Sequence, residues 1–183
     1  MNRAILAAAA LPAAALAELK QWLGISTGAD DAPLEALLAA AVEACEGFTG
    51  LLPLASACEE IVSPADGAWI ALATRPVFAI TAVAALAADG TRTPLAPGTW
   101  EPDLDADGTG RLRIARPEAA RRFAVQFSAG LAQDWDALAP GLRHGIVRLA
   151  AHQHRERESE GAAPLPPASV AALWRPWRRV RLA

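Results

Sequence analysis

The sequence of 183 residues has no tyrosine, one methionine, one lysine and two cysteines. The cysteines, Cys45 and Cys58, do not form a CxxC pair, so the spacing typical of zinc ribbons and dithiol redox sites is absent. We interpret both as reduced core residues. Apart from Lys20, every basic residue is arginine, a bias that by itself indicates no function.

Motifs that carry catalysis are also missing. The sequence contains no phosphate-binding P-loop, no GxGxxG dinucleotide fingerprint, no GxSxG nucleophile turn and no paired cysteine and histidine nucleophile. Without a set of acid, base, nucleophile or metal ligands, no reaction can be assigned. We therefore predict a protein that is not an enzyme and has no cofactor.

Two patterns resemble metal sites only in part. Residues 103–108 (Asp-Leu-Asp-Ala-Asp-Gly) match the opening of an EF-hand loop, but the twelfth position is Ile114 where a bidentate glutamate is needed. A hairpin turn is the better interpretation. The histidines, His144, His152 and His154, have no accompanying ligand motif. No metal site is predicted.

The N-terminus allows two interpretations. A basic start followed by the apolar residues 4–17 is typical of a secretory signal that would be cleaved after Ala17. Alternatively, Pro12 opens a helix that runs to Leu23, which such a cleavage would divide. We favour the helix. The segment is too short to predict a membrane span, and no membrane partner is expected.

Hydrophobic periodicity predicts an α+β fold that is mainly helical. A period of 3.6 predicts helices over 12–23, 32–49 and 140–158, and a period of two indicates strands within residues 56–128. We predict a small helical bundle with an inserted antiparallel β-sheet, forming one domain over 12–160. Residues 161–183 would then form a linker, a short helix and an extended tail.

The last ten residues are basic and aromatic. Residues 174–183, here called the C-terminal hook, contain four arginines and two tryptophans but no acid, whereas the rest of the chain has 13 basic and 20 acidic residues. Trp and Arg are enriched at binding hot spots, which favours a docking role. The simpler alternative is that Trp174 and Trp177 fold back onto the body and the arginines are solvated. Direct DNA binding is disfavoured by the acidic body.

A second charged segment ends the predicted third helix. Residues Arg155, Glu156, Arg157 and Glu158 are charged on all sides of the helix. This pattern is typical of a solvated helix face, and a contact with a neighbouring subunit is the functional alternative.

Taken in order, the motifs resemble the head–tail connector (adaptor) proteins of long-tailed phages and of bacterial gene transfer agents. The likeness spans about residues 16–182 and rests on order and spacing. The motifs are Leu19–Ile25, Asp30-Asp31, Leu34–Ala41, Cys45–Gly50, Arg75–Val77, Ile80–Val83, Asp89-Gly90, Val125–Gly130, Pro140–Glu158 and Trp174–Leu182. The compact, alanine-rich chain is most like a gene transfer agent adaptor.

The resemblance implies a structural role without catalysis. Such proteins form a ring, usually dodecameric, on the portal; the ring extends the DNA channel and receives tail-side connector or stopper proteins. Double-stranded DNA would pass without specific binding. Localisation would be cytoplasmic during assembly and then in the virion. The expected portal-binding residues are Trp174, Arg175, Pro176, Trp177, Arg178, Arg179, Arg181 and Leu182.

An alternative function from another class is an exported small α+β binding protein. It follows from the signal-peptide interpretation of residues 1–17 and predicts a mature chain that begins near Glu18.

Overall fold

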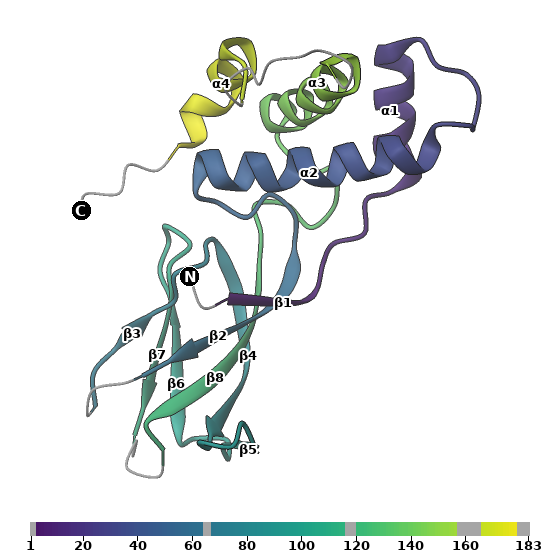
Figure 1. Cartoon of the computed structure of the whole chain (residues 1–183). Coiled ribbons are helices and arrows are strands. Elements are labelled where there is room, and N and C mark those ends of the chain that lie inside the picture. The colour runs from purple at the N-terminus through teal and green to yellow at the C-terminus, as the bar shows by residue number, and fades with distance from the viewer. Residues whose placement is uncertain (1–2, 64–66, 116–119, 157–165, 179–183) are drawn as a thin grey trace. The chain divides into compact units, whose positions relative to one another are not determined.

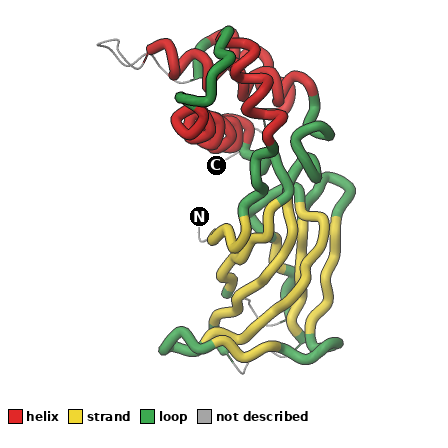
Figure 2. The backbone as a smooth tube through the Cα atoms, turned by 90° about the vertical axis from the view of Figure 1, so that its right-hand side faces the viewer, coloured by secondary structure: helices red, strands yellow, loops and turns green. Residues whose placement is uncertain are grey.

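A computed structural model describes residues 3–63, 67–115, 120–156 and 166–178 (Figure 1). The chain divides into two compact units. Unit 1 comprises Met1–Ala9 and Ala55–Leu131 and contains the strands, and unit 2 comprises Ala10–Leu54 and Ala132–Ala183 and contains the helices (Figure 2). Each unit therefore draws on segments from distant parts of the sequence.

Unit 2 begins with two helices that end at glycines. Helix α1 (Ala13–Leu23) is followed by Gly24, and α2 (Asp31–Thr49) by Gly50. Both glycines have φ of 74°, a left-handed conformation that costs glycine little because it has no Cβ. The amide of each glycine donates to a carbonyl of the preceding turn, which partly satisfies the open end of the helix.

Two later helices complete unit 2. Helix α3 (Pro140–Glu156) packs against both α1 and α2, and α4 (Ala168–Trp174) packs mainly against α3. A short 3₁₀ turn, Arg175–Trp177, extends α4. The core consists of buried apolar side chains at helical spacing: Leu19 of α1, Leu34 and Leu38 of α2, and Leu142, Ile146 and Leu149 of α3.

Unit 1 contains two antiparallel sheets. The five-stranded sheet has the order β1-β2-β8-β4-β5, and the three-stranded sheet has the order β3-β7-β6. The strands are β1 (Arg3–Ala7), β2 (Ser56–Val62), β3 (Ile70–Ala71), β4 (Val77–Leu86), β5 (Arg92–Pro94), β6 (Trp100–Leu104), β7 (Gly110–Ile114) and β8 (Arg122–Ala129).

Strand β8 forms the centre of the larger sheet. Its residues Phe123, Val125 and Phe127 are fully buried, as their alternation with smaller or polar residues predicts. Cys58 of β2 lies opposite Phe127, and Ile80 of β4 lies opposite the same residue on the other side. This central apolar row explains why β8 is the strand most evident in the sequence.

A buried carboxylate connects the β2 strand to the segment before β4. Glu60 accepts hydrogen bonds from the Ala73 amide at 2.9 Å, the Thr74 amide at 2.8 Å and the Thr74 hydroxyl at 2.6 Å. Glu60 is only 6% exposed, so these three donors replace the water that the carboxylate loses. Glu60 thereby holds the chain where it leaves β3.

Its neighbour Glu59 spans the larger sheet toward β5. The carboxylate accepts a 2.8 Å hydrogen bond from Arg92, and the Gln126 amide lies 3.4 Å away. The hydrogen bond from Arg92, with a smaller contribution from Gln126, lowers the pKa of Glu59 although burial opposes the shift. The pair therefore stabilises the ionised carboxylate.

We expect Glu59→Gln to reduce the free energy of unfolding near neutral pH and to have less effect in acid. Because the folded-state pKa of Glu59 lies below its ordinary value of 4.5, its stabilisation is complete above that pH. It is lost as the pH falls through the lowered folded-state pKa. Urea unfolding of both proteins across this range measures the difference, and a constant difference would contradict the assignment.

The α+β class is confirmed, but "mainly helical" overstates the helix content, because strands occupy nearly as many of the described residues as helices. The structure also contains β1, which the sequence did not indicate; this strand pairs with β2 from Arg3 to Ala7. None of the helices in the described part of the chain has the length and apolar character needed to cross a membrane.

Candidate partner-binding site at the C-terminus

Helix α4 anchors the start of the C-terminal hook in unit 2. Its residues Val170 and Trp174 lie four positions apart, on one helix face, and are 1% and 0% exposed. The Trp174 indole N–H donates to the Leu142 carbonyl at 3.3 Å. A Cβ added at Gly145 would lie far inside van der Waals contact of the same indole nitrogen. Trp174 thus lies in a slot on α3 that requires glycine.

Phe48 of α2 completes this anchor. Its ring centroid lies 6.0 Å from that of Trp174 with an interplanar angle of 52°, within the range of favourable aromatic pairs. On the same Phe48 ring, the Arg178 guanidinium lies 5.3 Å from the centroid, which is a cation–π distance. The hook is therefore held at Trp174 and again at Arg178.

Apart from these two contacts, the described part of the hook after Trp174 is largely open to solvent. Arg175, Pro176 and Arg178 are exposed, and Trp177 is half-buried. Neither Arg175 nor Arg178 forms an ion pair with a described residue. The arrangement presents two cations beside a large aromatic side chain, the composition that binding hot spots favour.

The structure therefore separates two roles within the predicted portal-binding residues. Trp174 is occupied by the core of its own chain, so its side chain positions the hook rather than presenting a surface. Arg175, Pro176, Trp177 and Arg178 remain accessible in whole or in part. The other predicted residues, Arg179, Arg181 and Leu182, lie outside the described residues.

The predicted subunit-contact segment lies at the end of α3. Arg155 is exposed, and the half-buried Glu156 lies 2.9 Å from the His152 ring nitrogen one turn earlier. Arg157 and Glu158 lie outside the described residues.

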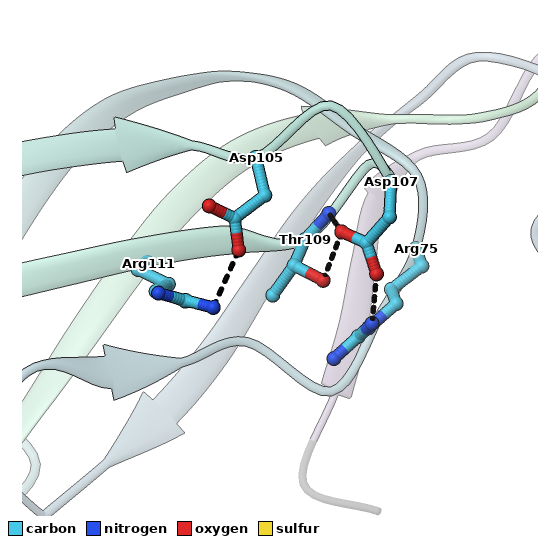
Figure 3. A network of polar contacts seen from close by, with 5 residues as sticks. All are labelled: Arg75, Asp105, Asp107, Thr109 and Arg111. Carbon is cyan, nitrogen blue, oxygen red and sulfur yellow. Dashed lines mark hydrogen bonds and ion pairs between the residues drawn. The ribbon is translucent and has the colours of Figure 1, made fainter.

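The aspartate-rich segment is the turn of the β6–β7 hairpin, as its sequence suggested (Figure 3). Asp105 forms an ion pair with Arg111 at 2.5 Å. Asp107 accepts hydrogen bonds from the Thr109 amide and hydroxyl and forms a 3.1 Å ion pair with Arg75. These two carboxylates stabilise the turn, since Asp105 pairs with an arginine and Asp107 pairs with an arginine and a threonine hydroxyl.

The remaining candidates for chemistry are possible metal ligands and the two cysteine thiols. No group of three or more His, Cys, Asp or Glu side chains within the described ranges is placed to hold a metal ion. Burial raises the pKa of the Cys45 thiol to about 12, so its reactive thiolate form is scarce near neutral pH. Cys45 and Cys58 are both buried, as core residues are, and neither forms a disulfide with a described residue.

Comparison with known proteins gives matches of two kinds. Residues 13–87 match the model of the family described as "Phage gp6-like head-tail connector protein". A chain from a structure described as "Neck of empty GTA particle computed with C6 symmetry" is 29% identical, with a TM-score of 0.76 and coverage of 100% of this chain and 98% of that chain. No curated protein matches the sequence significantly.

Two more solved chains resemble this one to a similar degree. The first, from "Virion of native gene transfer agent (GTA) particle", is 29% identical with a TM-score of 0.74, covering 100% of this chain and 98% of that chain. The second, from "Neck of native GTA particle computed with C12 symmetry", is 29% identical with a TM-score of 0.72, covering 98% and 97%. The resemblance predicted from the sequence is confirmed.

Proposed function

We propose that this chain, which resembles head–tail connector proteins in sequence and chains of gene transfer agent particles in fold, is a structural adaptor of a phage-like particle. It would occupy the head–tail interface of the virion after assembly in the cytoplasm. The observation that carries this proposal is the match over nearly the full length of both chains, since a shared module alone would leave one of them partly uncovered.

Within that role we assign the chain to a ring bound to the portal. The matching necks were computed with sixfold and twelvefold symmetry, which supports a closed, dodecameric ring of identical subunits. Its other partners would be tail-side connector or stopper proteins. The ring would extend the DNA channel without catalysing a reaction.

The exposed part of the C-terminal hook is the proposed portal contact. Trp177 would fill an apolar pocket on the portal, and Arg175 and Arg178 would pair with acidic side chains around it. Arg179, Arg181 and Leu182 would extend this contact, as the resemblance implies. Trp174 would keep the hook in place from within unit 2.

Double-stranded DNA must slide through such a ring without being held. Outside the C-terminal hook the chain has 13 basic and 20 acidic residues, and this net negative charge disfavours a tight grip on phosphates. We therefore propose passage of DNA without specific binding.

The test is an affinity purification of the tagged chain from particle-producing cells, with the intact mass of the chain measured. Recovery of portal and tail proteins with an uncut chain is the expected result. Recovery of the chain alone, shortened to begin near Glu18, would instead support the exported binding protein, because the signal would then have been removed.

A further inference from the structure

Helix α3 presents a basic stripe to solvent. His144, Arg148, His152 and Arg155 lie at intervals of four, four and three residues, so they share one face of the helix. None of the four is fully buried. His152 has Glu156 as a neighbour at 2.9 Å, but neither Arg148 nor Arg155 forms an ion pair with a described residue. The two arginines leave this stripe positively charged.

An exposed tryptophan borders the basic stripe. Trp22, near the end of α1, is 44% exposed, and its ring meets His144 edge to face at a centroid distance of 5.2 Å. Trp22 also lines a pocket together with Arg148, His152 and Arg155. A large apolar ring beside unpaired arginines is the composition of a protein-binding surface. It suits a partner that offers carboxylates next to small apolar side chains.

Helix α2 presents such a surface. Its exposed side carries two carboxylates, and the rest is small or proline: Ala32, Pro33, Glu35, Ala36, Ala39, Ala40, Glu43 and Gly47. The helix contains four acidic residues and no basic one. The carboxylates of Glu35 and Glu43 form no hydrogen bond or ion pair with a described residue. This acidic stripe lies opposite the α2 residues that pack into the core, such as Leu34 and Leu38.

We propose that the basic stripe of α3, with Trp22, binds the acidic stripe of α2 in a second copy of this chain. The inference rests on the proposed ring and identifies the contact that would close it. Arg148 and Arg155 are about 10.5 Å apart along α3, and Glu35 and Glu43 about 12 Å apart along α2, so both charge pairs form in one register. The alanines between the glutamates allow the Trp22 ring to approach closely.

A second copy explains the two stripes better than another partner does. A ring of identical subunits needs two different, mutually complementary surfaces on each chain, because every contact is head to tail. Here the two surfaces carry opposite charge, and both belong to unit 2. A nucleic acid would match only the basic stripe and would leave the acidic one without a role.

Charge reversal tests the contact in particle-producing cells. One variant carries Arg148→Glu and Arg155→Glu, and the other carries Glu35→Arg and Glu43→Arg, each with its own epitope tag. For either variant alone, we expect the amount of the chain in purified particles to fall to less than about a tenth of the wild-type amount, because like charges then face each other. Expressed together, the two variants are expected to regain incorporation, since each then offers the charge that the other needs.

Arg121→Glu with Arg122→Glu is the matched control for the variant with Arg148→Glu and Arg155→Glu, because it makes the same change in net charge on exposed residues of unit 1. Thermal unfolding of each purified variant verifies that the helices are intact. Normal incorporation of either single-stripe variant would overturn this inference while leaving the adaptor role in place. Failure of the mixed pair to recover would also overturn it. Absence of the wild-type chain from particles would instead overturn the adaptor role itself.

Discussion

Deletion of residues 175–183 is expected to abolish incorporation of the chain into particles while leaving unit 2 folded. The deletion removes the exposed cations and Trp177, but it retains α4, whose Val170 and Trp174 supply the burial. Of the described contacts to the rest of unit 2, mainly the Arg178–Phe48 cation–π pair is lost, worth about 0.5–1 kcal/mol at an exposed site. Particle yield and thermal unfolding of the purified chain measure the two effects separately.

A single substitution tests how much the Trp177 side chain contributes to the proposed binding of the hook to the portal. If Trp177 fills a pocket on the portal, Trp177→Ala weakens docking by about 2 kcal/mol or more per subunit. Trp69→Ala is the matched control, since Trp69 is 44% exposed in unit 1 and stacks only with Arg113 among the described residues. Normal incorporation of the chain without residues 175–183 would show that the hook does not bind the portal.

Gly145→Ala is expected to destabilise unit 2 by about 1–3 kcal/mol. Alanine improves helix propensity by roughly 1 kcal/mol, but the added Cβ cannot coexist with the Trp174 indole. Displacing the ring breaks its hydrogen bond to the Leu142 carbonyl and opens a cavity around a fully buried tryptophan. Steric exclusion therefore outweighs propensity. Chemical denaturation monitored by tryptophan fluorescence measures the change.

Gly47→Ala is the control with the opposite sign. Gly47 lies in α2, is exposed, and has nothing within 4 Å of the position that a Cβ would take. Only helix propensity then acts, so we expect stabilisation by about 0.5–1 kcal/mol. Equal effects at the two glycines would contradict the packing of Trp174 against α3.

Local pattern determined several elements without help from the rest of the fold. The spacing of Leu34, Leu38 and Cys45 gives α2 one apolar face, and these residues are buried in the structure. Gly50 ends the same helix in the left-handed conformation that glycine adopts most easily. Such features are predictable because neighbours within one turn decide them.

Contacts between distant segments decided the rest. The strand Arg3–Ala7 has no alternation of its own, and it forms because β2 offers an edge to pair with. The sequence also left the role of Trp174 open between docking and folding back onto the body, since its burial depends on Gly145, which lies 29 positions earlier in the chain. The residue type indicated an aromatic anchor. Only the packing of the folded chain decides whether that anchor lies in the core of its own chain or in a partner.

The candidate surfaces follow the same division. Sequence alone determined that the C-terminal hook is basic and aromatic and that α2 is acidic, because charge is a property of composition. Only the tertiary structure decided that Trp22 lies beside the basic stripe of α3, since α1 and α3 are separated by more than a hundred residues and meet through their buried faces. Which side chains stay exposed depends on which ones the core buries. The core forms from contacts between segments distant in the sequence, so exposure cannot be read from composition.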